Sequence, residues 1–589
     1  MKINYKLLLA TGSLLFFISI SCEESFLEKN PYGSLSESTL STKPGLDGLL
    51  IGAYSLLDGG GAIGGDIWAG WEYLLSPDDA RMGTESGASE INTFSVDASF
   101  QYIQARWQFQ YAAVQRCNDV LRMLPKVTDL KPEEALQIEA EAKFLRGIYY
   151  FYLAAIWKNV PWIDETISYT QNNYLVSNTV PVWPNIEADF MFAADNLTPS
   201  KSEVGRANKW AAKSFLAKVY MFQKKFAEAK AVLDDVIPNG QTANGKKYGL
   251  QANYGDNFKT AFKHSQEAVF TVQMSVNDGA NGPNGNPMDQ YNGSFGGPAS
   301  CCFGWFQPTY DLVDAHQTDA TTGLPLLDTY QNTPIPHDNG LASSDPFTPY
   351  TGTLDPRLDY SVGRRGIPYL DWGVHPGKAW VRNQFNSGPY SSIKNLATQA
   401  RVATDRQGGG GSTNTPLNII RFADVLLWAA ECEVEVGTLA KAEEYVNLVR
   451  ARAANPAGFV HTYIDPTKPL AGFTTTPAAN YYVGLYTGEF DANGKAYARK
   501  AVRFERRLEM AMEHIRYLDL LRYDGNDFDV AARHNWVMQV EAPRLSNPTN
   551  LYKTGHFVKG KHELFPIPLG EIELSVKAGS SALVQNPGW

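Results

Sequence analysis

The same spacing of small and large apolar residues occurs in two distant segments of this 589-residue chain. In each segment a small residue is followed 9, 12, 16 and 19 positions later by apolar residues, in the series Ala217, Phe226, Ala229, Leu233, Val236 and Ala430, Leu439, Ala442, Val446, Val449. Small residues let two antiparallel helices approach closely, and large ones fill the gap to the next hairpin. The pattern therefore predicts helical hairpins that stack on one another.

These offsets are those of tetratricopeptide (TPR) hairpins, and Gly437 stands where the second hairpin would turn. Ala430 follows Ala217 by 213 residues, so other segments separate the two patterns. We therefore predict a TPR-type superhelix that is interrupted by insertions. Two isolated helical hairpins are the alternative that the spacing leaves open.

Other elements are predicted from the periodicity of apolar residues. Helical spacing occurs over 101–124, 133–157 and 503–523, and a strand-like run covers 268–276. From 240 to 416 the chain is dense in Gly, Pro and Asn, which mark turns and loops. The predicted fold class is mainly α: a TPR-type helical superhelix with a large irregular, loop-rich region that contains a few short strands.

These patterns divide the chain into five segments. They are a lipoprotein signal peptide (1–21), an N-terminal helical region with the first TPR-like hairpins (22–240), a loop-rich, aromatic insertion that we expect to bind the ligand (241–416), a second TPR-like helical region (417–525) and a C-terminal tail packing on the core (526–589). Aromatic loops mounted on a rigid helical frame are where recognition sites usually lie.

The composition limits the classes of partner. The formal net charge is −10, from 52 basic and 62 acidic residues, which argues against nucleic acid as the main partner. With 44% hydrophobic residues the chain is not intrinsically disordered. Only 19% of residues are charged and 12% are aromatic, a balance that favours a neutral, polar ligand.

The first residues predict export and a lipid anchor. Lys2 and Lys6 precede the apolar run 7–20, and Ser21 then precedes Cys22. A cysteine directly after such a run resembles a bacterial lipoprotein signal, in which Cys22 is lipidated and tethers the protein to a membrane. Ordinary signal-peptidase cleavage near Ser21 is the alternative. Later in the sequence, no apolar run reaches the length of a membrane-spanning helix.

The remaining four cysteines show no C-x-x-C spacing of a zinc or redox site. Cys117 and Cys432 lie in helical patterns, so we expect them to be small buried apolar residues. Cys301 and Cys302 are adjacent. They form either a strained vicinal disulfide or two free thiols.

Weak cofactor patterns are present, and each has a simpler explanation. Gly59, Gly61 and Gly64 match G-x-G-x-x-G, but a helical pattern precedes them and no βαβ unit surrounds them. The run 408–412 lacks the lysine of a phosphate-binding loop. The Gly- and Asn-rich loops could hold Ca²⁺, although no EF-hand spacing occurs. We predict no cofactor and no metal site.

A cluster of ionisable residues lies on the predicted helix 503–523. Glu509, Glu513 and His514 could suggest a metal ligand set or a general base, but their order is not H-E-x-x-H. Ion pairs with Arg506 and Arg516 on the same helix face explain them more simply. We therefore predict a solvated or half-buried ion-pair lattice here.

Four aspartates are candidates for glycoside hydrolysis, which needs two carboxylates across a cleft. Asp78 and Asp79 are adjacent, and Asp311 and Asp314 lie far along the chain. A sequence does not reveal the distance between carboxylates, so these residues only keep a hydrolase as an alternative. We predict no catalytic residues.

Aromatic residues are the strongest functional signal. Sugar rings stack their apolar C–H faces on aromatic rings while their hydroxyls bond to nearby Asn, Asp and Arg, and such rings occur here among turn residues. The alternative is that each ring is buried in the core. We favour burial for four tryptophans that lie in helical patterns: Trp107, Trp157, Trp210 and Trp428. The predicted ligand-binding residues are Trp68, Trp71, Tyr291, Trp305, Phe306 and Trp372.

Motifs along the whole chain resemble those of the SusD/RagB family of Bacteroidetes surface lipoproteins. Ser19 in the lipidation signal and His514 depart from the family pattern. The motifs are SCEESFLEKNP (21–31), AEAKFLRGIYYFYLAAIWKNVPWI (140–163), NKWAAKSFLAKVYMFQKKFAEAKAVLDDVI (208–237), PTYDLVDA (308–315), LDPRL (354–358), IIRFADVLLWAAECEVEVG (419–437), ERRLEMAMEHIRYLDLLRY (505–523), LFPIP (564–568) and QNPGW (585–589).

The resemblance implies a TPR superhelix with a loop-rich ligand face and no catalysis. It implies a protein that is lipid-anchored in the outer membrane, faces the cell exterior, captures a glycan and delivers it to a TonB-dependent, SusC-like transporter. No family-wide motif fixes the ligand residues, so their choice rests on the aromatic argument. A glycoside hydrolase, and a TPR scaffold that binds protein only, are the alternative functions. The glycan itself is not determined by the sequence.

Overall fold

The structure is a computed structural model of the chain. It describes residues 36–57, 78–83, 89–167, 175–280, 284–287, 293–299, 304–407, 412–513, 515–525, 527–547, 550–577 and 582–589. Several residues of the sequence predictions lie outside these ranges: Cys22, Gly59, Gly61, Gly64, Trp68, Trp71, Tyr291, Cys301, Cys302 and His514.

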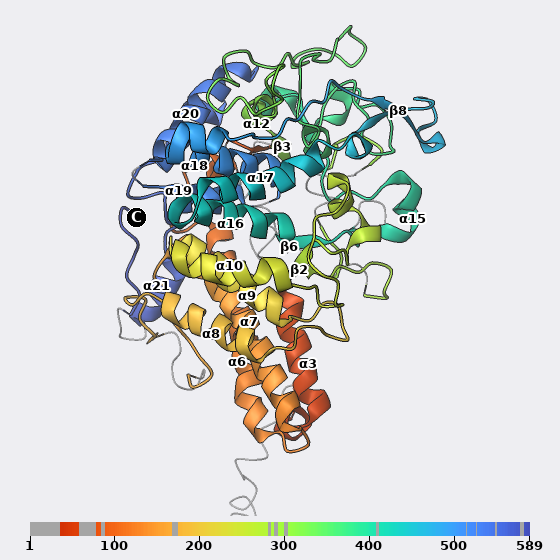
Figure 1. The fold of residues 1–589 in the computed structure, drawn as a ribbon. Coiled ribbons are helices and arrows are strands. Elements are labelled where there is room, and N and C mark those ends of the chain that lie inside the picture. Colours follow the sequence, from red (N-terminus) through yellow and green to blue (C-terminus); the bar gives the residue numbers. More distant parts are fainter. Residues whose placement is uncertain are drawn as a thin grey trace, which may run out of the picture.

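Eight helices form a continuous stack in which each helix contacts the next (Figure 1). They are α6 (Gln101–Met123), α7 (Pro132–Trp157), α8 (Trp183–Asn196), α9 (Lys209–Phe222), α10 (Phe226–Asn239), α16 (Phe422–Val436), α17 (Leu439–Ala453) and α18 (Glu489–Glu509), with a break in α18 at Gly494. A further helix, α3 (Lys43–Tyr54), packs on α6 and α7. The predicted superhelix is confirmed, and the alternative of isolated hairpins is wrong because α10 packs directly on α16.

The two hairpins that the spacing predicted are α9–α10 and α16–α17. Their small positions, Ala217, Ala229, Ala430 and Ala442, are all buried. One helix of each hairpin begins with a side-chain cap: Asn208 accepts a hydrogen bond from the Ala211 amide at the start of α9, and Thr438 accepts one from the Lys441 amide at the start of α17. The residues therefore define each hairpin locally, and burial of the apolar positions joins one hairpin to the next.

The insertion between the two hairpins has one strand near its start and one at its end, and these two strands pair in a small sheet. Strand β2 (Ala268–Val272) pairs antiparallel with β6 (Leu417–Arg421), with Val272 opposite Leu417. The predicted strand 268–276 is thus confirmed in its first five residues, whereas β6 was not predicted. The other sheets also have two strands each: β1 (Ala80–Met82) with β3 (Phe306–Pro308), β4 (Val362–Gly363) with β5 (Ser391–Ser392), and β7 (His461–Tyr463) with β8 (Phe473–Pro477).

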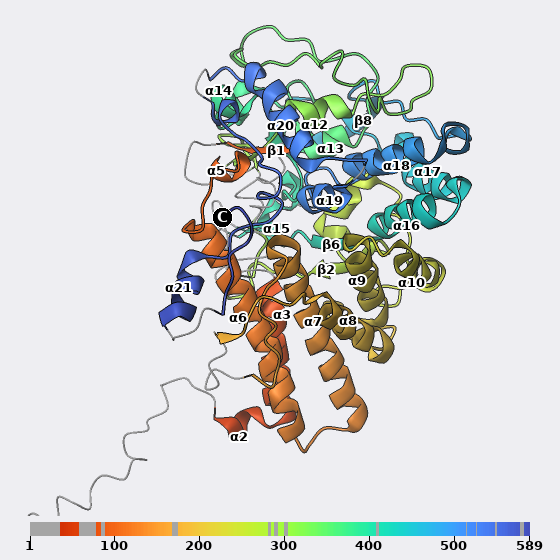
Figure 2. The same ribbon diagram turned by 90° about the vertical axis from the view of Figure 1, so that its left-hand side faces the viewer.

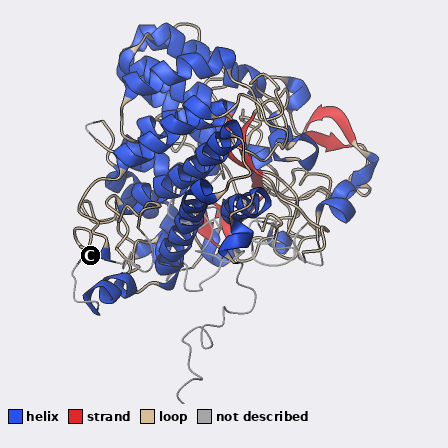
Figure 3. Ribbon diagram, turned by 90° about the horizontal axis from the view of Figure 1, so that it is seen from below, coloured by secondary structure: helices blue, strands red, loops and turns tan. Residues whose placement is uncertain are grey.

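Short helices and long loops make up most of the rest of the described chain (Figure 3). The helices are α2 (Glu37–Leu40), α5 (Ser89–Asn92), α12 (Tyr310–Ala315), α13 (Leu358–Ser361), α14 (Gln384–Ser387), α15 (Val402–Asp405), α19 (Arg516–Tyr523), α20 (Val530–Glu541) and α21 (Leu569–Lys577). Figure 2 shows α21 beside α6. Tail residues also reach α7, where the Trp157 indole donates a hydrogen bond of 2.8 Å to the Pro566 carbonyl.

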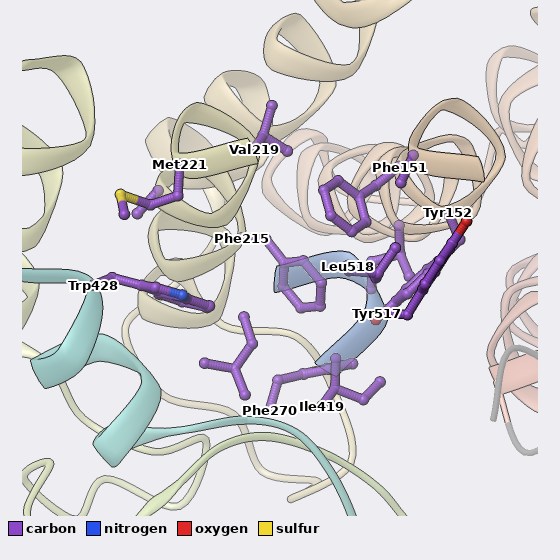
Figure 4. Packing of buried hydrophobic residues seen from close by; sticks show 14 of the residues in the cluster. Phe151, Tyr152, Phe215, Val219, Met221, Phe270, Ile419, Trp428, Tyr517 and Leu518 are labelled. Carbon is purple, nitrogen blue, oxygen red and sulfur yellow. The ribbon is translucent and has the colours of Figure 1, made fainter. Parts of the chain in front are cut away.

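An aromatic core lies where the stack meets the β2–β6 sheet (Figure 4). The Phe215 ring of α9 contacts three other rings, with centroid distances of 5.3 Å to Phe144, 5.4 Å to Phe190 and 5.7 Å to Phe270 of β2. Offset and edge-to-face ring pairs of this kind add to the free energy gained from burial. Trp428 of α16 and Tyr517 of α19 complete the same core.

Helices α18 and α19 correct one prediction. The pattern 503–523 predicts a single helix, but α18 ends at Glu509 and α19 begins at Arg516. Between them Met512 has a φ of 62°, which no α-helix accommodates. The break lets Glu513 face Arg421 and Lys394 from the insertion rather than a neighbour on its own helix. The predicted ion pairs exist, but the predicted partners Arg506 and Arg516 are wrong for Glu509 and Glu513. The expectation of a solvated or half-buried lattice is wrong as well, because Glu509 is fully buried.

A buried group of ion pairs, the Glu509 network, joins the insertion to the stack. The Glu509 carboxylate lies 3.0 Å from Arg357, 2.9 Å from Arg421 and 2.5 Å from Arg452. Arg421 also pairs with Glu267, which directly precedes β2. Arginine suits such sites because its five N–H donors can serve several carboxylates at once. Both ends of the insertion are therefore tied to α17 and α18.

A second group of ion pairs, the Asp78 network, holds the chain ahead of β1. Asp78 pairs with Arg516 at 2.7 Å and with Arg533 at 3.2 Å. Arg507 of α18 pairs with Asp311 of α12 at 2.6 Å and with Asp79 at 3.0 Å. Three segments that are distant in the sequence, with Asp311 and Arg507 196 residues apart, thus meet within one buried group of ion pairs.

Replacement of Glu509 by Gln should destabilise the fold strongly at neutral pH. Burial opposes ionisation of Glu509, but Arg452, Arg421 and Arg357 outweigh it and lower the pKa of its carboxyl group from 4.5 to about 2. The carboxylate therefore stabilises the fold above pH 4.5, and this contribution is lost as the pH falls towards 2. Loss of one partner of a buried ion pair costs about 3–5 kcal/mol. Urea unfolding at several pH values measures the effect.

The matched control is Glu444→Gln, because Glu444 makes an exposed ion pair with Lys441. We expect the control to change the unfolding midpoint little at any pH. The Glu509 variant should also lose less stability than the wild type between pH 4.5 and pH 3. Equal effects of the two substitutions would contradict a central role for the Glu509 network.

Candidate functional site

The short β1–β3 ladder places Gly83, directly after β1, next to Trp305, and it places the segment before Ala80 next to Thr309. Met82 is opposite Phe306 in the ladder, and the Gly83 amide donates a hydrogen bond of 2.6 Å to the Trp305 carbonyl. The Thr309 hydroxyl donates to the Asp78 carbonyl at 2.6 Å. Because the Asp78 network holds this ladder on α18, the position of Trp305 is fixed by the scaffold.

Trp305 and Phe306 have different surroundings although they are adjacent. Trp305 is half-buried and packs against the main core, whereas Phe306 is only 1% exposed. Side chains alternate between the two faces of a strand, so β3 directs the Phe306 ring into the core. The Phe306 ring is therefore buried in this structure, and Trp305 is the more accessible of the two predicted contacts.

A hollow of about 450 Å³, here called the Arg382 hollow, opens next to Trp305. Gly304, which precedes Trp305, has a φ of 54°, and a Cβ at that position would stand 3.1 Å from Phe295 Cβ and 3.4 Å from Arg382 Cβ. The hollow is lined by Phe295, Gly296, Asn339, Gly340, Lys378, Ala379, Val381, Arg382, Asn383, Gln384, Phe385 and Ser546.

Two exposed aromatic rings line the Arg382 hollow. Phe295 is 38% exposed and Phe385 is 49% exposed. The Arg382 guanidinium lies over the Phe295 ring, 5.0 Å from its centroid, in a cation–π arrangement. Helix α14, which carries Phe385, is bonded to the ladder because the Ser387 hydroxyl donates to the Met82 carbonyl at 2.6 Å. These rings are therefore presented by anchored loops.

Carboxamide groups of the same hollow have unused hydrogen-bonding capacity. Gln384 is buried. Its carboxamide N–H faces the Asp338 carboxylate as a hydrogen-bond donor, while its Oε1 accepts no hydrogen bond from the described residues. Asn339 donates to the Arg544 carbonyl at 3.1 Å, but its Oδ1 accepts no hydrogen bond from the described residues. Buried polar atoms usually have partners, so water or a ligand must supply them here. No carboxylate occurs among the described lining residues.

Trp372 lies in a small separate core rather than in the Arg382 hollow. This small core consists of Ala299, Tyr369, Ile393 and Leu396, with Leu370, Trp372 and Trp380 packed against it. The half-buried Trp372 indole donates a hydrogen bond of 2.9 Å to the Ala397 carbonyl. Trp380 lies between Ala379 and Val381, which line the Arg382 hollow. Trp372 thus supports the neighbouring wall.

The remaining predictions for aromatic and cysteine residues can be placed. Trp107, Trp157 and Trp428 are buried as predicted, and Trp210 is half-buried against the same core. Cys117 and Cys432 are buried free thiols, as predicted. Sequence reasoning missed Arg382, Phe385, Asn339 and Gln384, although Asn339 lies in the Gly-, Pro- and Asn-rich stretch 240–416. Phe295 was also not among the predicted ligand-binding residues.

The four aspartates considered for hydrolysis are not arranged across a cleft. All four are buried, and each pairs with at least one arginine. Burial raises the pKa of Asp314 to about 6 despite its contact with Arg544. Among the described residues, no group of His, Cys, Asp and Glu has the arrangement of a metal site. The ion pairs account for these carboxylates structurally.

Comparisons with protein families identify the relationship. A family model described as "SusD family" matches residues 266–589, and one described as "Starch-binding associating with outer membrane" matches 25–221. The chain belongs to the SusD family. Relatives include a SusD-like protein of Bacteroides ovatus, 25% identical over 76% of each chain, and SusD-like protein P25 of Formosa agariphila, 23% identical over 95% of each chain.

Solved structures share this SusD fold. A laminarin binding SusD-like protein is 20% identical, with a TM-score of 0.63 over 93% of this chain and 100% of the other. A SusD-like carbohydrate binding protein from Bacteroides fragilis is 22% identical, with a TM-score of 0.66 over 91% and 99%. Surface glycan-binding protein A from Bacteroides thetaiotaomicron is 18% identical, with a TM-score of 0.59 over 93% and 100%.

The helices of the SusD-family chain were also compared with the requirements of a membrane span. Within the described ranges, none combines the length and the apolar character that crossing a membrane requires.

Replacement of Asp338 by Asn should stabilise the fold at neutral pH. Asp338 is 1% exposed beside the Arg382 hollow, and the nearest guanidinium nitrogen, of Arg365, is 4.0 Å away. Burial raises the pKa of this carboxyl group from 3.8 to about 6. Ionisation therefore costs stability, and the cost grows as the pH rises from about 4 to about 6. We expect Asp338→Asn to gain about 1–3 kcal/mol at pH 7.5 and little at pH 4.

Urea unfolding over this pH range measures the difference between variant and wild type. The exposed ion pair of Asp328 with Lys500 provides a control, Asp328→Asn, which should show no such pH dependence. A gain for Asp338→Asn that is the same at pH 4 and pH 7.5 would contradict the assignment.

Proposed function

We propose that this SusD-family protein is a cell-surface lipoprotein that captures an oligo- or polysaccharide. The observation that carries the proposal is the Arg382 hollow, where two exposed aromatic rings lie beside carboxamides with unused hydrogen-bonding atoms. Its volume of about 450 Å³ is within the range of small-molecule sites. The names of the laminarin-binding and glycan-binding structural neighbours support the same class of ligand.

Sugar rings match the chemistry of this hollow. Their C–H faces can pack on the rings of Phe295 and Phe385, and their hydroxyls both donate and accept hydrogen bonds. A carboxamide offers one acceptor and two N–H donors, so the Gln384 side chain suits a hydroxyl in either role. The Arg382 guanidinium adds donors above the Phe295 ring. Trp305 adjoins this group through Gly304, and Trp68, Trp71 and Tyr291 remain predicted contacts.

We propose that the glycan is neutral. The formal charge of the whole chain is −10, which disfavours the approach of sulfated or uronic polymers. The carboxamides of Asn339 and Gln384 bind hydroxyls without requiring charge. Lys378 and Arg382 are the features of the hollow that an acidic sugar would use instead, so acidic polymers belong in the experimental comparison.

We further propose that the protein is anchored in the outer membrane through lipidated Cys22 and faces the cell exterior. From there it would deliver its glycan to a TonB-dependent, SusC-like transporter. The family description that includes association with the outer membrane supports this location. The export signal and Cys22 in the sequence support the anchor.

Catalysis is not part of this proposal. The carboxylates of Asp78, Asp79 and Asp311 are engaged by arginines in the Asp78 network, so they do not provide the acid and base of a glycosidase. Sensitive detection of new reducing ends, after incubation with each polymer that binds, tests this view. Release of products by the purified protein would favour the hydrolase alternative.

Replacement of Phe385 by Ala should weaken glycan binding, since one stacking surface of the Arg382 hollow is lost. A glycan array first identifies the polymer, and calorimetric titration then compares Phe385→Ala, Phe295→Ala and Trp305→Ala with the wild type. By analogy with stacking on nucleic acid bases, each loss is expected to cost about 1–3 kcal/mol.

The matched control is Phe262→Ala, because Phe262 is 40% exposed and lines no described hollow with the other rings. The control should bind like the wild type. Glycan binding that tolerates all three substitutions would place the binding site elsewhere and overturn the proposal for the Arg382 hollow. Retention of transporter but of no glycan would favour the protein-binding scaffold.

Replacement of Cys22 by Ser should release the protein from the outer membrane, because the acyl chains attach to the Cys22 thiol. Metabolic labelling with an alkyne fatty acid and fractionation of the outer membrane measure the effect in the native host. Cys117→Ala is the control, since the Cys117 thiol is buried in α6 and should not accept a lipid. Equal labelling of the Cys22 variant and the wild type would contradict the anchor.

A further inference from the structure

A second hollow, here called the Phe473 hollow, lies on the other side of the small core. It has a volume of about 390 Å³. Ile393 and Leu396 of the small core form part of its surface, and Ala397, which accepts the Trp372 hydrogen bond, lines it too. The lining is completed by residues of the β7–β8 hairpin and α15, and by Thr260 and Ala261 of the 3₁₀ helix η7 (Thr260–Phe262), whose Phe262 does not line the hollow.

An exposed aromatic ring faces this hollow from the β7–β8 hairpin. Phe473 is 45% exposed, although it stacks on Tyr463 of the paired strand with 5.0 Å between ring centroids. The Tyr463 hydroxyl donates to the Leu370 carbonyl at 2.8 Å and accepts from the Gly373 amide at 3.1 Å. The hairpin is therefore held against the Trp372 loop, and one face of the Phe473 ring is left for a ligand.

Two further rings extend the aromatic surface. Tyr360 and Phe459 both line the hollow, and the Tyr360 hydroxyl donates to the Phe459 carbonyl at 3.4 Å. The Tyr360 ring lies directly on the backbone of Gly255, where a Cβ would come within 2.2 Å of it. Phe459 packs edge-on against Tyr481. Both rings are thus positioned by their neighbours before any ligand binds.

Polar groups border these rings. Both carboxylate oxygens of Asp371 accept backbone hydrogen bonds, from Gln399 at 2.6 Å and Ala400 at 2.9 Å. Each oxygen keeps a second lone pair, and no described cation pairs with Asp371. Arg401 and Asp405 form a two-bond pair at 2.7 and 3.0 Å, while the Arg401 side chain remains half-exposed. Acceptors and donors therefore stand beside an aromatic surface.

Apart from Asp371, the charged side chains that line this hollow are paired within the chain. Arg401 is paired with Asp405, Lys259 with Asp256, and Asp359 with Arg364. A charged ligand would have to compete with these pairs. A purely apolar ligand would desolvate Asp371 and Arg401 without replacing their hydrogen bonds to water, which is costly. The balance favours an uncharged ligand with one apolar face and several hydroxyls.

We propose that the Phe473 hollow is a second carbohydrate-binding site, which takes a neutral sugar unit independently of the Arg382 hollow. The sugar stacks on Phe473, Phe459 and Tyr360, and its hydroxyls bond to Asp371 and Arg401. The proposal rests on the proposed function only in the choice of sugars as probes, because the hollow is built from a different set of residues.

Fluorine NMR of protein labelled with 5-fluorotryptophan tests the proposal with a separate reporter for each hollow. Trp372 reports on the Phe473 hollow and Trp305 on the Arg382 hollow, and Trp372→Phe and Trp305→Phe assign their signals. The probes are laminaribiose, cellobiose, maltose and xylobiose at millimolar concentrations, with glucuronate as the charged comparison. We expect at least one disaccharide to shift the Trp372 signal in a saturable manner.

Phe473→Ala and Arg401→Gln should each weaken this response about tenfold or more. Phe385→Ala, in the Arg382 hollow, should leave it unchanged and thus serves as the matched control. Both Phe473 and Arg401 have exposed side chains, and circular dichroism confirms that the variants fold.

The proposal is overturned if no probe shifts the Trp372 signal, if only glucuronate does, or if Phe473→Ala and Arg401→Gln respond like the wild type. If sugars shift only the Trp305 signal, the second site is overturned and the proposed function stands. If sugars shift only the Trp372 signal, the second site is supported and the Arg382 hollow is not the glycan site.

Discussion

One carboxylate, that of Glu509, holds together parts of the chain that the helical stack alone would not join. It contacts arginines from the insertion, from β6 and from α17, all within a buried volume. Charges in such a place are stable only while each has its partners. The loop-rich face therefore has a defined position on the helices. The ion pairs of Arg357, Arg421 and Lys394 hold the loops that form the two hollows in place.

The helical frame could be predicted because its information is local. Apolar residues at helical spacing identify α9, α10, α16 and α17, and the same offsets imply their packing. The ion-pair partners could not be predicted, since Arg421 and Glu509 are 88 residues apart and no spacing rule connects them. For the same reason the break between α18 and α19 was missed: Glu513 turns towards Arg421 and Lys394, and that long-range attraction overrides a helical pattern.

The ligand face was predictable in composition and region but not residue by residue. Turn residues and aromatic rings mark the insertion correctly as the irregular region. Whether a given ring faces outward depends on strand pairing, and the three-residue β3 is too short for its alternation to be read from the sequence. The burial of Phe306 was therefore not predicted, while Phe385 was missed because exposed phenylalanine looks like a core residue in sequence. The chemistry of Gln384 and Asn339 depends on burial, which only the folded chain defines.

The pairing of β2 with β6 has an evolutionary consequence. Since the two borders of the insertion are hydrogen-bonded neighbours, the helices on either side meet whatever length of chain runs between Val272 and Leu417. The entropic cost of lengthening such an excursion rises only logarithmically. Evolution could thus replace the recognition loops while the helical frame stays the same. A chimera joined at these two strands would gain a new ligand specificity and keep the folding of the helical frame.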